Sequence, residues 1–253
     1  MPRFFLEVAY KGTAYSGFQK QDNAITVQSE VENALFVLYR KSVELTTSSR
    51  TDAGVHALQN FFHFDADIVI DEQQTLYRLN AILSRDIVIK KITQISDEAH
   101  SRFDAVSRSY EYRIHQKKAP FLTDRSFHYP YQLNVDDLNK AASLLFSYQD
   151  YTSFSKRNTQ VKTFLCDIQK AEWKWIHEEL IFFVTANRFL RGMVRGLTGT
   201  MLKVGRGILS IDDFAKIIEA KDCSKADFSV PPHGLFLIQV SYPETIWKQW
   251  EES

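Results

Sequence analysis

The residues around position 52 have types and spacing that could carry out nucleophilic chemistry. Residues 48–57 read SSRTDAGVHA and place a cation, Arg50, two positions before an anion, Asp52. A guanidinium close to a carboxyl group favours the ionised form of that group, which is the form that acts as a nucleophile. The same composition is also typical of a plain turn, because Asp and Gly are favoured there and Thr-Asp can bond to its own backbone. The local sequence leaves both interpretations open.

A second segment, residues 188–206, is rich in arginine and could bind an anion. It contains five basic residues and no acidic one. Its apolar spacing predicts a helix, on which Arg188, Arg191 and Arg195 fall at i, i+3 and i+7 and share one face. Such a stripe is usually a solvated helix face. The absence of acidic partners in this segment nevertheless favours contact with phosphate or carboxylate groups.

A third segment, residues 100–112, mixes basic and aromatic side chains and includes Tyr110. A tyrosine in a predicted strand is most often an ordinary core or edge residue. Alternatively, its ring offers a face on which a base could stack, and its hydroxyl could take part in proton transfer. The sequence around Tyr110 is compatible with either role.

The rest of the sequence carries no signature of a metal or cofactor site. Residues 205–207 (GRG) lack the third glycine of a dinucleotide-binding fingerprint and do not follow a predicted strand. P-loops, nucleophile elbows and HExxH motifs are also absent from the sequence. His56, His63 and His100 do not have the spacing of metal ligands, so we expect them to have structural or hydrogen-bonding roles. We therefore expect a site without a metal or cofactor.

Composition and charge are those of a globular protein that is not basic overall. The chain has 253 residues, of which 44% are hydrophobic and 25% charged, and this excludes disorder for the bulk of it. Lys and Arg together number 31, as do Asp and Glu, so the formal net charge is zero. The charges balance in each half of the chain, which excludes a polybasic tail. Any affinity for nucleic acid must therefore come from a local patch.

The cysteines and the termini bear on where the protein works. Cys166 and Cys223 are the two cysteines of the chain, and they form neither a disulfide framework nor a zinc-binding pattern. The first residues have no apolar core long enough for a signal peptide, and no stretch approaches the roughly 20 apolar residues that span a bilayer. We therefore expect a protein of the cytoplasm that has no membrane partner.

Periodicity and turn signals predict interleaved helices and strands. Paired strands around 43–65 and 164–186 indicate antiparallel pairing, which favours an α+β fold over a doubly wound sheet. The second half of the sequence roughly repeats the first, so we expect two similar lobes with a cleft between them. We place the lobes at residues 1–105 and 106–253. The predicted strands are 3–10, 43–48, 57–65, 86–95, 107–115, 164–176, 180–186 and 235–242, and the predicted helices are 26–39, one around 76–82, 134–146, 189–204 and one from 210.

Several segments, in the same order along the chain, resemble the TruA-type tRNA pseudouridine synthases. Residues 50–57 (RTDAGVHA) match the RTD-x-GVHA signature of that family, which is highly specific. Three residues depart from the family pattern, namely Phe18, Ser49 and Ser84. These departures concern loop geometry and do not change Asp52. The other matching segments are 15–19 (YSGFQ), 79–83 (LNAIL), 102–105 (RFDA), 108–112 (RSYEY), 150–154 (DYTSF), 189–195 (FLRGMVR) and 231–235 (PPHGL).

The resemblance implies a fold, a reaction and a set of partners. The fold is α+β, with two similar lobes and mainly antiparallel sheets flanking a central RNA-binding cleft. The reaction is the isomerisation of uridine to pseudouridine at positions 38–40, in the anticodon stem-loop of tRNA, without a cofactor. The family acts as a homodimer, so we expect a homodimer here.

The same resemblance implies roles for individual residues. Asp52 matches the catalytic aspartate, and Arg50 and Arg195 would keep its carboxylate ionised and in place. Tyr110 matches the active-site tyrosine that stacks on the base and is a candidate for proton transfer from C5. The basic segment with Arg188 and Arg191 would contact phosphates.

Two other functions are weighed against this one. A non-catalytic RNA-binding protein of the same fold would use the arginines and not Asp52, but it would have no chemical reason to keep the intact Arg-Thr-Asp triplet. A carboxylate-dependent hydrolase would need a second acid or base close to Asp52, and the segment offers only His56. The isomerase is therefore favoured.

Overall fold

The computed structural model describes residues 1–67, 69–157 and 161–247. Contacts between residues divide the chain into two compact units. Unit 1 contains residues 1–106 together with the chain from Leu237 onwards, and unit 2 is Ser107–Phe236. The domain boundaries expected from the sequence, 1–105 and 106–253, stay a prediction; in the contacts, the last strand packs with the first unit.

Unit 1 is built on antiparallel strands with apolar and aromatic side chains. The central strand β1 (Arg3–Tyr10) pairs on one edge with β3 (His56–Asp65) and on the other with β4 (Ile87–Ile95). The short β2 (Thr46–Thr47) pairs with β3, and β9 (Leu235–Ser241) follows β3 in the strand order. Alternate side chains of β1 point to opposite faces of the sheet. Both faces are covered, since Leu6 on one face and Phe5 on the other are almost fully buried.

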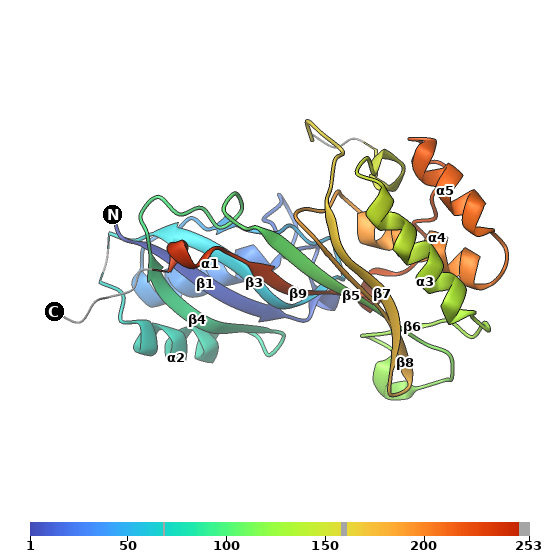
Figure 1. Ribbon diagram of the computed structural model, residues 1–253. Coiled ribbons are helices and arrows are strands. Elements are labelled where there is room, and N and C mark those ends of the chain that lie inside the picture. Colours follow the sequence, from blue (N-terminus) through green and yellow to red (C-terminus); the bar gives the residue numbers. More distant parts are fainter. Residues whose placement is uncertain (68, 158–160, 248–253) are drawn as a thin grey trace. The chain divides into compact units, whose positions relative to one another are not determined.

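Two helices complete unit 1 (Figure 1). Helix α1 (Val27–Tyr39) begins at a capping box in which Thr26 and Ser29 bond to each other's backbone. Helix α2 (Glu72–Ile82) begins where the Asp71 side chain accepts a bond from the Gln74 backbone. Such caps satisfy backbone N–H groups that have no partner inside the helix. Helix α2 contacts β4 and α1, and buried Leu35 and Leu79 contribute to the core of the unit.

Unit 2 repeats the combination of antiparallel strands and helices. Its strand order is β5 (Ser107–His115), β8 (Glu179–Ala186) and β7 (Ile168–Ile176), and both pairings are antiparallel. The short β6 (Phe127–His128) pairs with the end of β5 in parallel. The mainly antiparallel α+β arrangement predicted from the sequence is confirmed.

The helices of unit 2 lie together on one side of its strands (Figure 1). They are α3 (Val135–Leu144), α4 (Met193–Gly205) and α5 (Ile211–Glu219). Helix α3 contacts β7 and both other helices, and most residues of α4 are buried. Short 3-10 turns occupy Gly12–Ala14, Pro120–Leu122, Leu145–Ser147, Thr152–Phe154, Pro232–Gly234 and Glu244–Ile246.

Three sequence predictions about these elements are wrong in extent. The strand predicted at 43–48 is reduced to Thr46–Thr47, and the strand predicted from 164 begins at Ile168. The helix predicted at 189–204 begins only at Met193, because Gly192 has a φ of 76°, in the left-handed region, and ends the preceding segment. Among the described residues, none of the helices combines the length and apolar character that a membrane span requires.

Candidate active site

The loop that carries Asp52 joins β2 to β3, and a buried asparagine fixes its first residues. Asn60, on β3, is fully buried. Its amide nitrogen donates to the Ser49 carbonyl at 2.8 Å, and its amide oxygen accepts from the Ser49 N–H at 3.3 Å. The Ser48 N–H donates to the Phe61 carbonyl at 2.9 Å. The loop therefore leaves the sheet at a defined position, three residues before Asp52.

The middle of the loop is a turn held by neighbouring segments. The Thr51 hydroxyl lies 2.7 Å from the Tyr10 hydroxyl, and the Thr51 carbonyl accepts from the Phe18 N–H at 3.2 Å. The Val55 N–H donates to the Asp52 carbonyl at 3.2 Å. The turn interpretation is thus confirmed, and it is compatible with chemistry. Asp52 is half-buried, and the backbone carbonyls of Thr51 and Asp52 are both hydrogen-bonded.

The end of the loop packs against Gly12 so closely that no side chain would fit there. A Cβ atom on Gly12 would lie 1.9 Å from the Val55 carbonyl oxygen. The Gly12 N–H donates to His56 Nδ1 at 3.0 Å, so this nitrogen of His56 is an acceptor. His56 is 1% exposed. Its predicted hydrogen-bonding role is confirmed.

The other two histidines singled out from the sequence also have hydrogen-bonding roles. His63 Nδ1 lies 2.8 Å from the Ser101 hydroxyl, and His100 Nδ1 accepts from the Arg102 N–H at 3.1 Å. Burial, with a smaller contribution from His100, lowers the pKa of His63 to about 4. His63 is therefore a neutral side chain at pH 7. Among the described residues, no three His, Cys, Asp or Glu side chains are grouped so that they could hold a metal ion.

The departures from the family pattern are accommodated locally. Ser49 does not have a positive φ, so the backbone accommodates its Cβ without strain. Phe18 is fully buried and stacks on Phe62, with ring centroids 4.4 Å apart. Ser84 places its hydroxyl 2.7 Å from that of Tyr15.

Arg50 has a different environment from Asp52, although both belong to the same loop. Its side chain is exposed and makes no hydrogen bond or ion pair with any described residue. The pairing of Arg50 with Asp52 inside the turn, which the spacing suggested, is therefore not formed. A role for Arg50 toward Asp52 or a substrate stays a prediction.

In unit 2, two tyrosines on the same face of β5 differ in exposure. Tyr110 is half-buried, and its ring meets Phe189 edge to face with centroids 5.0 Å apart. Tyr112 is fully buried, and its hydroxyl donates to the Pro231 carbonyl at 2.7 Å. Burial raises the pKa of Tyr112 far above its usual value. Tyr112 is therefore the core tyrosine, while Tyr110 keeps part of its surface accessible.

The three arginines do not share a helix face as predicted. Only Arg195 lies on α4, in its first turn, whereas Arg188 and Arg191 belong to the irregular segment between β8 and α4. Two bonds hold this segment out of the helix: the Asn187 N–H donates to the Asp167 carbonyl at 3.1 Å, and the Arg191 carbonyl accepts from the Lys156 N–H at 2.9 Å.

The guanidinium of Arg195 is fixed by backbone carbonyls. Its Nε donates to Val230 at 2.8 Å, and Nη2 donates to Phe228 at 3.3 Å. Arg191 is exposed and Arg188 is half-buried. Arg195 is thus a positioned cation, and Arg191 is a surface cation.

The predicted site residues form two sets, one in each unit. Arg50 and Asp52 lie in unit 1, and Tyr110, Arg188, Arg191 and Arg195 lie in unit 2. Arg50 and Asp52 share one loop, and Tyr110 on β5 contacts Phe189, which belongs to the arginine segment. That the two sets form one site stays a prediction.

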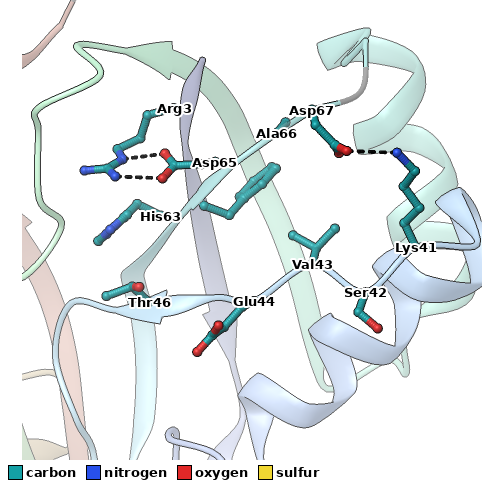
Figure 2. A pocket seen from close by; sticks show the side chains of 11 residues that line it. Arg3, Lys41, Ser42, Val43, Glu44, Thr46, His63, Asp65, Ala66 and Asp67 are labelled. Carbon is teal, nitrogen blue, oxygen red and sulfur yellow. Dashed lines mark hydrogen bonds and ion pairs between the residues drawn. The ribbon is translucent and has the colours of Figure 1, made fainter. Parts of the chain in front are cut away.

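Unit 1 also contains a polar hollow of about 280 Å³, at the Asp65 end of β3 (Figure 2). Arg3 and Asp65 pair there at 2.7 Å, and Lys41 and Asp67 pair at 2.9 Å. The Asp52 loop enters β3 at the opposite end, at His56. A strand of this length spans roughly 30 Å. The hollow is therefore separate from the Asp52 loop, and four of its charged side chains form the two ion pairs.

The residues that support the loop were not predicted from the sequence. Asn60, Tyr10 and Gly12 were not singled out, although all three contact the Asp52 loop directly. One signal was available for Asn60. Asn is disfavoured in strands, so an Asn beside three aromatic residues in a predicted strand indicates a buried hydrogen-bonding role.

Comparison with known proteins agrees with these features. A family model described as tRNA pseudouridine synthase matches residues 141–243. The tRNA pseudouridine synthase A of Parabacteroides distasonis is 46% identical over 248 residues, which cover 98% of this chain and 98% of that protein. That of Azobacteroides pseudotrichonymphae is 44% identical, covering 98% of this chain and all of that protein (100%).

More distant relatives match over the same length. The tRNA pseudouridine synthase A of Staphylococcus aureus is 33% identical over 244 residues, which cover 96% of this chain and 92% of that protein. The similarity therefore includes the Asp52 loop as well as the arginine segment. The chain belongs to the tRNA pseudouridine synthase family and, like its members, is an isomerase.

Proposed function

We propose that this protein converts uridine to pseudouridine at positions 38–40 in the anticodon stem-loop of tRNA, with Asp52 as the nucleophile and without a cofactor. The observation that carries the proposal is the support of the Asp52 loop. Three segments, around Tyr10, Phe18 and Asn60, hydrogen-bond to it and leave the carboxylate half-buried. A nucleophile must be held within a fraction of an ångström to react efficiently, and such support provides this.

The reaction rearranges bonds within one nucleotide. The carboxylate of Asp52 attacks either the pyrimidine ring or the sugar C1′, and the bond between N1 and C1′ breaks. The detached base turns, C5 bonds to C1′, and the bond to Asp52 breaks, which returns the free carboxylate. C5 then loses its proton and N1 takes one up. Atoms and charge balance without an external electron donor, so no redox cofactor is needed.

Tyr110 and Arg195 are the groups we assign to this chemistry from unit 2. The half-buried ring of Tyr110 can stack on the base, and its hydroxyl is the candidate for the proton transfer from C5. Arg195, fixed by two carbonyls, supplies a positive charge in a set position to keep the Asp52 carboxylate ionised. Arg50 would assist from the exposed side of the loop.

Arg188 and Arg191 are assigned to phosphate contacts. A uridine in the anticodon stem-loop must leave its stack before it can react, at a cost of a few kcal/mol. Contacts to the RNA backbone offset this cost. Because the formal net charge is zero, one copy offers only a local basic patch. We infer that two copies act together as a homodimer in the cytoplasm, across a cleft that reads the shape of the tRNA.

Position-specific detection of pseudouridine tests the proposal. An unmodified tRNA transcript with uridines at 38, 39 and 40 is incubated with the protein, and pseudouridine is located by carbodiimide-dependent stops of reverse transcription. We expect stops one nucleotide to the 3′ side of each of these positions and not elsewhere. A transcript in which they are replaced by cytidine is the control. Binding of tRNA without any stop would instead favour the non-catalytic RNA-binding protein.

A further inference from the structure

Unit 2 contains a cavity of about 510 Å³ that none of the proposed catalytic residues lines. It lies where β5 ends, at His115, and where the chain returns through β6. A volume of 300–1,000 Å³ is typical of pockets that bind small organic groups. The lining residues are His115, Lys118, Ala119, Thr123, Ser126, Phe127, His128, Pro231 and His233.

The charge of the lining is one-sided. Lys118 contributes a positive charge to it, and none of the described residues that line it is a carboxylate. Asp124 lies in the same loop but outside the lining, and it pairs with Arg125 at 3.1 Å. The cavity therefore favours a ligand that carries a negative charge.

The aromatic groups of the lining suit a flat, partly polar ligand. The rings of His115 and His128 stack with centroids 5.2 Å apart and an angle of 26° between their planes. His115 Nδ1 lies 3.1 Å from the Ser126 hydroxyl. Burial lowers the pKa of both His115 and His233. Repulsion from His128 and His233 lowers the pKa of His115 further, while the negative charge of Glu179 raises it. Neutral imidazoles offer both donors and acceptors, as the edge of a base does.

We propose that this cavity binds one unstacked nucleotide of the RNA substrate, with its base among the imidazoles and Phe127 and its phosphate at Lys118. The proposal rests on the proposed function in one respect, namely that the substrate is RNA. Unpaired bases splayed onto aromatic side chains are the usual means by which proteins recognise single-stranded parts of RNA. The bound nucleotide is distinct from the one that reacts, since Asp52 and Tyr110 are not in the lining.

Binding of unmodified tRNA by two variants tests the proposal without any need for turnover. Ala119→Trp fills the cavity, and Lys118→Ala removes the cation. Each should weaken binding at least about fivefold, the lower end of what one stacked base contributes. Lys117→Ala removes an exposed neighbouring lysine outside the lining and should change binding less than about twofold. If both cavity variants bind tRNA with the wild-type Kd and unfold at the wild-type Tm, the proposal is overturned.

A second measurement separates this proposal from the proposed function. Uridine 5′-monophosphate is titrated into the wild type and into Ala119→Trp, and the imidazole C–H signals of His115, His128 and His233 are followed by NMR. Saturable shifts in the wild type alone support the cavity, even if no tRNA is isomerised. If these signals respond but Ala119→Trp and Lys118→Ala both bind tRNA normally, the cavity takes a free nucleotide and the RNA subsite is rejected.

Discussion

The loop that carries Asp52 and the segment that carries Arg191 are both held by hydrogen bonds, but they differ in how far they expose these two charged side chains. In the loop, Phe18 and Asn60 bond to the backbone, Tyr10 bonds to the Thr51 hydroxyl, and the carboxylate of Asp52 is half-buried. In the segment from Asn187 to Arg195, backbone bonds also hold the chain, at Asn187 and Arg191, but the side chain of Arg191 is exposed.

The difference matches what the two kinds of group must do. A nucleophile loses rate steeply when it is displaced, whereas a phosphate contact in water tolerates motion of a long side chain. Arg195 is the exception in its segment, because two carbonyls fix its guanidinium. Its side chain is therefore positioned, as the Asp52 loop is, and this supports the role proposed for Arg195 in the chemistry.

Tyr110→Phe tests whether a positioned group of unit 2 takes part in the reaction. The ring keeps its contact with Phe189 and its stacking face, and only the hydroxyl is lost. If that hydroxyl moves the C5 proton, kcat should fall by roughly 100- to 10,000-fold while the Kd for tRNA stays within about twofold. Single-turnover kinetics measure this, and a normal kcat would leave Tyr110 with stacking alone.

Gly12→Ala tests whether the support of the loop is what makes Asp52 effective. The added methyl would lie 1.9 Å from the Val55 carbonyl, so the end of the loop must move. A shift of about 1 Å at a reacting group costs on the order of 100-fold in rate, and we expect a fall in kcat of that size.

Gly207→Ala is the matched control for Gly12→Ala. Gly207 has a φ of 72°, and no atom lies within 4 Å of the place that an added methyl would occupy, so the change strains the backbone without touching the loop. It should lower the free energy of unfolding by about 1 kcal/mol and leave kcat unchanged. Equal activity of the two variants would contradict the importance of the support.

Arg195→Lys tests whether Arg195 acts through its fixed geometry. Lysine keeps the charge but cannot donate from two directions to Val230 and Phe228. Hydrogen bonds from charged donors contribute about 1.5–3 kcal/mol each to the stability of an arrangement. If these bonds hold the charge of Arg195 in its reactive position, their loss should lower kcat roughly tenfold. The Arg188 side chain makes no hydrogen bond with a described residue, so the kcat of Arg188→Lys should stay within about twofold of the wild-type value. The reverse order of effects would contradict the comparison.

Arg191→Ala should have the smallest effect, and only on binding. Loss of one phosphate contact reduces the slope of log Kd against log salt by about one unit and leaves kcat unchanged. Lys216→Ala, on α5, removes an exposed lysine that lies 3.7 Å from Asp213 and is the control for a general change in charge. An unchanged slope in Arg191→Ala would mean that Arg191 is solvated surface.

The sequence predicted the two regions unequally well. Strands 3–10 and 107–115 were predicted with their observed bounds. The first is rich in aromatic and aliphatic residues and is followed by a polar loop, and in the second Tyr110, Tyr112 and Ile114 alternate with polar residues. The turn at Asp52 was predicted from its Thr-Asp and Gly. The arginine segment was predicted as a helix from residue 189, because apolar spacing does not reveal that Gly192 takes a left-handed φ or that Lys156 and Asp167 bond to the segment.

The supports of the loop were beyond sequence reasoning for a related reason. Tyr10, Gly12 and Asn60 act through contacts with residues more than ten positions away, and these depend on the register of β1 against β3. A one-residue shift of register would turn Asn60 to the other face of the sheet. The candidate carboxylate could be predicted from a local motif, while the geometry that positions it required the structure.

Release of tritium from tRNA labelled at C5 of uridine tests the central claim most directly. Wild type, Asp52→Ala and the nearly isosteric Asp52→Asn are compared on the same unmodified tRNA, with the Kd for tRNA measured in parallel. The account predicts release by the wild type and none above background by either variant, with Kd values within about threefold because the phosphate contacts lie elsewhere. Release by Asp52→Asn at a near wild-type rate would contradict Asp52 as the nucleophile.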